Sequence, residues 1–109
     1  SIESAHKDFC SSMESFKEAA SILYANAFET SHMMGKASMN LAQKTVVVAD
    51  SAKRVAVMLG SSIHVQKYVL SGAKVVAARA QQLILAAEKI SMTLKMSFWY
   101  KLMLLQVKR

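Results

Sequence analysis

Residues that interrupt helices are scarce in this sequence. Its 109 residues contain no proline and three glycines, where average usage gives roughly five prolines and eight glycines. Strand-like alternation is also rare, and the one β-prone run, TVVVA at 45–49, lies inside a helical repeat. Without these residues most of the chain is free to form helix. The sequence therefore predicts an all-α protein of one domain with a single core, and the first residue, Ser1, leaves open that it is a fragment of a larger protein.

Side chains that perform chemistry are equally sparse. Cys10 is the only cysteine, which excludes an intrachain disulfide and a cysteine-based zinc site. The histidines His6, His32 and His64 lie in separate segments, and His6 with Cys10 makes only one pair at i,i+4 spacing. The three glycines stand apart, so no glycine-rich phosphate loop is present. We expect no catalytic residues, no metal and no cofactor, and hence a protein that is not an enzyme.

Long uncharged runs are absent as well, while the charges that occur are unevenly placed. No stretch of 18 residues lacks a charge, which argues against a membrane span, and the single cysteine fits a reducing, cytoplasmic setting. Residues 1–30 hold five acids and two lysines, a net charge of −3, whereas residues 31–109 hold twelve Lys or Arg and two acids, a net charge of +10. An acidic first segment beside basic ones would favour antiparallel packing. The remaining positive surface is suited to acidic proteins, anionic lipid or nucleic acid.

The first predicted helix carries an apolar stripe at alternating three- and four-residue spacing. Its members are Phe9, Met13, Phe16, Ala20, Leu23 and Ala27. The helix begins either near Ile2 or behind a capping box formed by Ser11 and Glu14. Gly35 suits a C-terminal cap, so we expect the helix to end near Met34.

A second stripe, rich in alanine, predicts two further helices. It comprises Ala42, Ala49, Ala52, Ala56, Leu59, Ile63, Leu70, Ala73, Ala77, Ala80, Ile84 and Ala87. Gly60 ends one helix and Ser62 starts the next, while Gly72 is placed inside a helix. The last helix either runs unbroken past Lys89 or breaks between Ser91 and Thr93 to release a fourth. We expect an antiparallel three- or four-helix bundle with long helices, a modest alanine-lined core and a partly independent C-terminal helix.

The C-terminal stretch KMSFWYKLMLLQVKR, at 95–109, is apolar on two sides when it is drawn as a helix at about 100° per residue. One side is expected to continue into the core: Leu94, Phe98, Leu102 and Leu105. The opposite side is the predicted partner-binding surface: Met96, Trp99, Tyr100, Met103, Leu104 and Val107. The predicted charged rim consists of Lys95, Lys101, Lys108 and Arg109. A helix that is apolar all round is buried all round, so this one should pack on another helix, an identical chain, a partner protein or a bilayer surface.

Two short segments resemble known helical families. LSGAKVVAARAQQLILAAEK, at 70–89, resembles the talin-rod helices that bind vinculin, at Leu70, Ala73, Ala77, Ala78, Ile84 and Leu85, with Gln81 and Glu88 departing from the pattern. AASILYANAF, at 19–28, is similar to the A-x-x-L-Y-x-x-A signature of microtubule-interacting-and-trafficking domains, at Ala20, Leu23, Tyr24 and Ala27. Each resemblance covers less than a fifth of the chain, and we assign the chain to neither family. Both resemblances imply a helical binding module.

Three hypotheses of function follow from these patterns. The first is a non-enzymatic interaction or scaffold module that binds a partner helix or self-associates through the two-faced C-terminal helix. The alternative is a peripheral membrane-surface module, with Phe98, Trp99 and Tyr100 at the interface and the charged rim on anionic headgroups. Nucleic-acid binding is the second alternative, suggested by the net charge of +7 but opposed by only three arginines and no recognised motif. The expected location is cytoplasmic or peripheral to a membrane.

Overall fold

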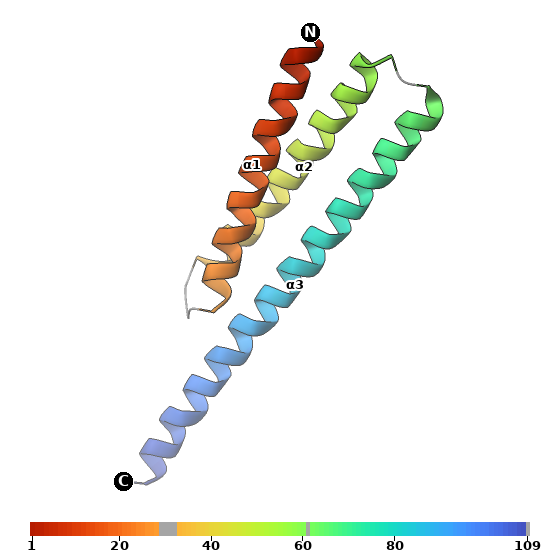
Figure 1. Cartoon of the computed structure of the whole chain (residues 1–109). Helices are drawn as coiled ribbons and strands as arrows, with labels where there is room; N and C mark the ends of the chain where they lie inside the picture. Colours follow the sequence, from red (N-terminus) through yellow and green to blue (C-terminus); the bar gives the residue numbers. More distant parts are fainter. Residues whose placement is uncertain (29–32, 61, 109) are drawn as a thin grey trace.

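The computed structural model describes residues 1–28, 33–60 and 62–108. These residues form three α-helices: α1 (Ile2–Ala27), α2 (Met34–Met58) and α3 (Ile63–Val107) (Figure 1). No strand occurs within the described ranges. The all-α prediction is confirmed.

The start of α1 is set by a local cap. Ser1 is the N-cap, and its hydroxyl oxygen accepts a hydrogen bond from the backbone N–H of Ser4 at 3.2 Å. This bond satisfies one of the amide groups that the first turn of a helix leaves without a partner. Of the two predicted starts, the one near Ile2 is therefore correct, and Ser11 and Glu14 lie inside α1.

The predicted end of the first helix is wrong. α1 ends at Ala27, and Met34 already begins α2, so Gly35 lies in the first turn of α2 and caps nothing. The cause is tertiary packing, because Ala27 and Met34 are both buried in the core. With α1 ending at Ala27 and α2 beginning at Met34, the apolar stripes of the two helices contribute to one buried cluster.

The second connection follows the sequence-based prediction. α2 ends at Met58, and Gly60 adopts a φ of +63°, a left-handed conformation that glycine tolerates better than other residues. Ser62 is the N-cap of α3, and its hydroxyl accepts a hydrogen bond from the N–H of Val65 at 3.4 Å. Both predicted boundary residues are confirmed.

α3 is one continuous helix of 45 residues, with Gly72 in its interior as predicted. The alternative break between Ser91 and Thr93 does not occur. The Thr93 hydroxyl instead donates to the carbonyl of Lys89 at 2.8 Å, one turn earlier in the same helix. The described residues therefore contain no fourth helix, and the C-terminal segment continues α3 without a break.

The three helices lie side by side in an elongated molecule. α1 and α2 form an antiparallel hairpin, and α3 returns along α2, packs less extensively on α1, and runs on beyond the turn of the hairpin (Figure 1). The principal dimensions are 72 × 23 × 13 Å, and the radius of gyration is 19.3 Å. A compact chain of this length has a radius of gyration of about 13 Å, so the molecule is far from globular.

The core is small. It lies at the end of the bundle where α1 finishes and α2 begins, which we call the hairpin end. The buried cluster consists of Ala19, Leu23, Ala27, Met34, Ala37, Leu41, Ala80 and Ala87. Leu23 and Leu41 are its only large side chains with no more than a trace of exposure among the described residues. Since burial contributes about 25 cal/mol per Å² of apolar area, an alanine-rich cluster of this kind gives modest stability, as the sequence predicted.

The alanine stripe is correct at Ala56 of α2 and in the middle of α3, and wrong at several other positions. In α2, Ala42 is exposed and Ala49 half-buried, while Leu41 and Val48 occupy the core because they bury more apolar area. In α3, Ile63, Leu70 and Ala77 are exposed although the stripe placed them inside. In the same part of α3, Val69, Ala73 and Val76 are half-buried, so the inward face of the helix is rotated relative to the predicted stripe.

Candidate interaction surface

The described residues gather no set of three or more His, Cys, Asp or Glu side chains able to hold a metal ion. His6 Nε2 lies 3.8 Å from Cys10 Sγ across one exposed turn of α1. His64 is exposed at the start of α3, and His32 lies outside the described residues. A single His–Cys contact supplies fewer ligands than the three or four that zinc takes from proteins.

The most unusual surface is the part of α3 that follows Ser91, residues 92–107, which we call the tail. Ser91 is the last buried residue of α3, and every residue of the tail is exposed. The hairpin of α1 and α2 stops short of it, so the tail projects alone beyond the hairpin end (Figure 1). An apolar helix in water loses the burial that normally stabilises helices in proteins.

All six predicted partner-binding side chains lie exposed on the tail: Met96, Trp99, Tyr100, Met103, Leu104 and Val107. Trp99 is 64% exposed, and its ring lies edge-on to that of Phe98 with centroids 6.4 Å apart. A shallow depression beside Trp99 is lined by Leu102 and Met103. The tail thus presents an aromatic pair and flexible methionine side chains to solvent, which are common components of binding surfaces.

The other side of the tail does not enter the core as predicted. Its members are all exposed: Leu94, Phe98, Leu102 and Leu105. The reason is helix length, because α1 and α2 have 26 and 25 residues and α3 has 45. Both apolar sides of the tail are therefore open.

The predicted charged rim is exposed where the structure describes it. Lys95 and Lys101 lie along the tail and Lys108 follows it directly, while Arg109 is outside the described residues. The sequence contains no acid after Glu88. The tail is consequently a basic as well as an apolar helix.

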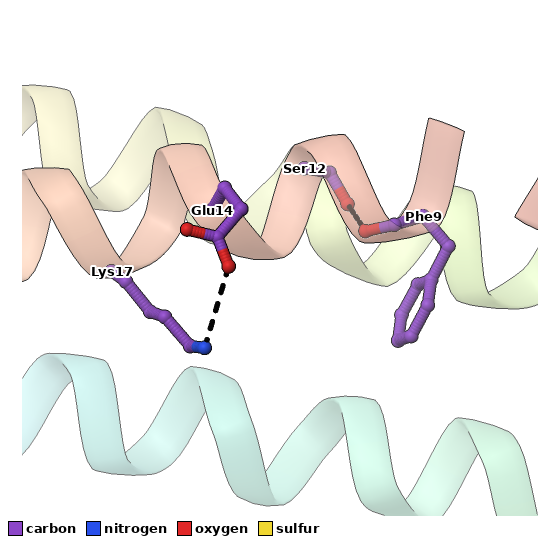
Figure 2. A network of polar contacts seen from close by, with 4 residues as sticks. All are labelled: Phe9, Ser12, Glu14 and Lys17. Atoms are coloured by element: carbon purple, nitrogen blue, oxygen red, sulfur yellow. Dashed lines mark hydrogen bonds and ion pairs between the residues drawn. The ribbon is translucent and has the colours of Figure 1, made fainter. Parts of the chain in front are cut away.

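A second apolar surface lies near the opposite end of the molecule, between the start of α3 and the hairpin. This groove of about 230 Å³ is lined by Phe9, Ala52, Val55, Ala56, Leu59, Val65 and Val69. Figure 2 shows Phe9 extending from α1 on the side that faces α3. Sequence reasoning placed Phe9 in the core and missed the groove, because a groove lined by three helices leaves no mark on the hydrophobic pattern of any one of them.

The acidic and basic helices do not pair directly. α1 carries four acids and two lysines, and the only ion pair among the described residues joins Lys17 to Glu14 at 3.5 Å within α1 itself. Both side chains are largely exposed, and Figure 2 shows the Lys17 ammonium reaching back to the Glu14 carboxylate. The acids of α1 are therefore open to a cationic partner.

In comparisons with known proteins, no family model, curated protein or solved structure matches this chain. Over residues 1–28, 33–60 and 62–108, no helix has the combined length and hydrophobicity that a membrane crossing requires. Function is therefore inferred from the tail, the groove and their charges.

Proposed function

We propose that this protein is a non-enzymatic interaction module that binds another helix through its tail. The supporting observation is a continuous helix, apolar on two sides, that projects from the bundle with both sides exposed. A partner that packs on only one side of a helix would leave the other side in water, so the tail is suited to insertion between helices. Methionines and aromatic rings allow such packing against imperfectly matched surfaces.

The exposed area of the whole chain agrees with this proposal. The accessible surface is 8186 Å², whereas a compact monomer of 12.0 kDa has about 6,000 Å². The excess of roughly 2,200 Å² per chain exceeds the ~800 Å² that each partner contributes to an interface of standard size. Many of the exposed side chains are large and apolar, which favours burial against a partner.

Binding to an anionic membrane surface is the second candidate, supported by Lys95 and Lys101 next to Trp99 and Tyr100. A helix that lies in a membrane interface has one apolar and one polar face. The tail has apolar side chains on two sides, so helix binding accounts for it better. Flotation with vesicles that contain or lack anionic lipid tests the membrane candidate, which requires binding that increases with lipid charge.

The substitution Trp99→Ala tests the helix-binding proposal. Trp99 is exposed, so its loss should change the free energy of unfolding of the isolated chain by no more than about 0.5 kcal/mol. If Trp99 is an anchor of the interface, its removal should weaken association at least tenfold, since such anchors contribute about 2 kcal/mol or more. Light scattering and binding to amphipathic helical peptides measure association, and circular dichroism measures helicity and melting.

Tyr68→Ala is the matched control, because Tyr68 is an aromatic residue of the same helix that is 81% exposed and lies outside the tail. It should leave association unchanged. The proposal fails if the unaltered chain stays monomeric at high concentration and binds no helical peptide.

A further inference from the structure

Resting on the proposed function, we propose that the partner is a second copy of this chain, whose tail packs as a fourth helix beside α1 and α3. Each copy would insert its tail beside the bundle of the other, an arrangement that we call the exchange. The two interfaces would be identical by symmetry. The elements brought together are the groove and acids of α1 in one copy and the apolar, basic tail of the other.

The directions of the helices suit this exchange. α1 and α3 run the same way and α2 runs against both (Figure 1). A fourth helix that runs antiparallel to α1 and α3 would complete an up-down-up-down bundle. A two-fold axis perpendicular to α3 reverses the direction of the partner's α3, so its tail would arrive antiparallel to both.

The tail of the same chain cannot take this position. α3 is unbroken from Ile63 to Val107, so its tail points away from its own bundle. The tail is roughly 24 Å long at 1.5 Å per residue, and α1 has 26 residues, or about 39 Å. A partner's tail therefore covers more than half the length of α1.

The surface that would receive the tail is apolar and incompletely covered. Phe9 and Phe16 of α1 are half-buried, as are Val69 and Val76 of α3. The groove beside Phe9 already opens between α1, α2 and α3. A fourth helix would cover these side chains and the apolar sides of the tail together.

Charge favours a second copy over an unrelated apolar helix. α1 has two more acids than lysines, whereas the tail is purely basic. Glu14 is largely exposed, and its ion pair among the described residues is with Lys17 of its own helix (Figure 2). Lys95 and Lys101 of a partner tail would bring cations to this acidic helix, and the reciprocal contact would repeat the attraction.

The native Cys10 provides a direct test. It is exposed on α1 and precedes Lys17 by seven residues, so at 3.6 residues per turn the two side chains point nearly the same way. Cys10 of one chain and residue 101 of the same chain are roughly 40 Å apart along the helices. A disulfide requires Cα atoms within about 7 Å, so a bond from Cys10 to the tail must join two chains.

The experiment introduces one tail cysteine at a time, as S97C, K101C or Q106C, and oxidises the full chain at low concentration. The three positions sample different registers of the tail along α1. We expect a covalent dimer from at least one variant, and we expect Cys10→Ser to abolish it. A covalent dimer that survives Cys10→Ser shows tail-to-tail pairing and overturns the exchange, although helix binding through the tail stands.

A matched pair of methionine variants supplies a second measurement. Met103 of the tail and Met39 on the outer side of α2 are 63% and 65% exposed. Sedimentation equilibrium should show about tenfold weaker dimerisation for Met103→Ala and an unchanged constant for Met39→Ala. A monomeric mass for the unaltered chain, together with binding to a helical peptide that Trp99→Ala weakens, would overturn the exchange alone. A monomeric chain that binds no peptide would overturn the proposed function too.

Discussion

Small hydroxyl side chains occupy the buried polar positions of the described chain: Ser12, Ser38, Thr45, Ser51 and Ser91. Several of them are satisfied inside their own helices. The Ser12 hydroxyl donates to the Phe9 carbonyl at 2.7 Å (Figure 2), and that of Thr45 donates to the Leu41 carbonyl at 2.7 Å. Such residues permit close helix approach without leaving a polar atom unpaired.

Ser38 differs, because its buried hydroxyl has no hydrogen-bond partner within the part of the chain that the structure describes. A buried polar group without a partner costs about 1–3 kcal/mol, and alanine is the better helix former. Ser38→Ala should therefore raise the free energy of unfolding by about 1 kcal/mol, measured by urea denaturation.

Ser12→Ala is the control for that substitution, since it removes a hydroxyl that is bonded. Its effect on the free energy of unfolding should be close to zero or destabilising. Equal stabilisation by both variants would show that helix propensity, and not the unpaired hydroxyl of Ser38, is the cause.

At the level of helices, replacing a glycine by alanine should change the free energy of unfolding in opposite directions at Gly72 and Gly60, because the two glycines have different conformations. Gly72 lies inside α3, and an added Cβ would meet nothing within 4 Å. Gly72→Ala should stabilise the protein by about 1 kcal/mol through helix propensity and a less flexible unfolded chain. Thermal and urea unfolding followed by circular dichroism measure the change.

Gly60→Ala should do the reverse. The space around Gly60 is also open, but its φ of +63° is strained for any residue with a side chain. We expect destabilisation of about 1 kcal/mol. Stabilisation by Gly60→Ala would mean that the connection between α2 and α3 adopts another conformation.

The sequence predicted those helix boundaries that depend on local chemistry. Gly60 and Ser62 carry their own conformational and capping preferences, so the start of α3 was correct. The turn after Ala27 was misplaced, because its position depends on the burial of Ala27 and Met34 against each other's helices. No residue near the turn signals that tertiary constraint.

The sequence predicted which side chains lie on each side of the tail, but not whether those sides are buried or exposed. Periodicity identified two apolar sides, with Trp99 on one and Phe98 on the other. It did not reveal that both would be exposed, since this depends on where the hairpin of α1 and α2 ends relative to α3. The groove beside Phe9 was missed for the same reason, because its lining residues come from all three helices.

For the whole molecule, the exchange predicts a doubled mass with little added length. One chain is 72 Å long. Reciprocal tails beside partner bundles give a dimer roughly 70–90 Å long, whereas pairing of the tails end to end gives about 120 Å. Small-angle scattering of the dimer measures this maximum dimension, and a value near 120 Å contradicts the exchange.

The unbroken helix between core and tail also fixes the rotational phase of the tail. Ala87 and Ser91 are buried, Thr93 is bonded within the helix, and no hinge separates them from Trp99. Because the helix is continuous, the core determines the direction in which every tail side chain points. Insertion of one alanine after Ser91 should turn the tail by about 100° and prevent association.

Insertion of seven helix-forming residues at the same place returns the tail to within about 20° of its original angle. Although the tail then lies roughly 10 Å farther out, it should recover part of the association that the single insertion removes, as light scattering would show. If both insertions weaken association equally, the distance of the tail from the bundle, and not its rotational angle, limits binding. A straight helix thus allows the small core to orient a surface that it does not touch.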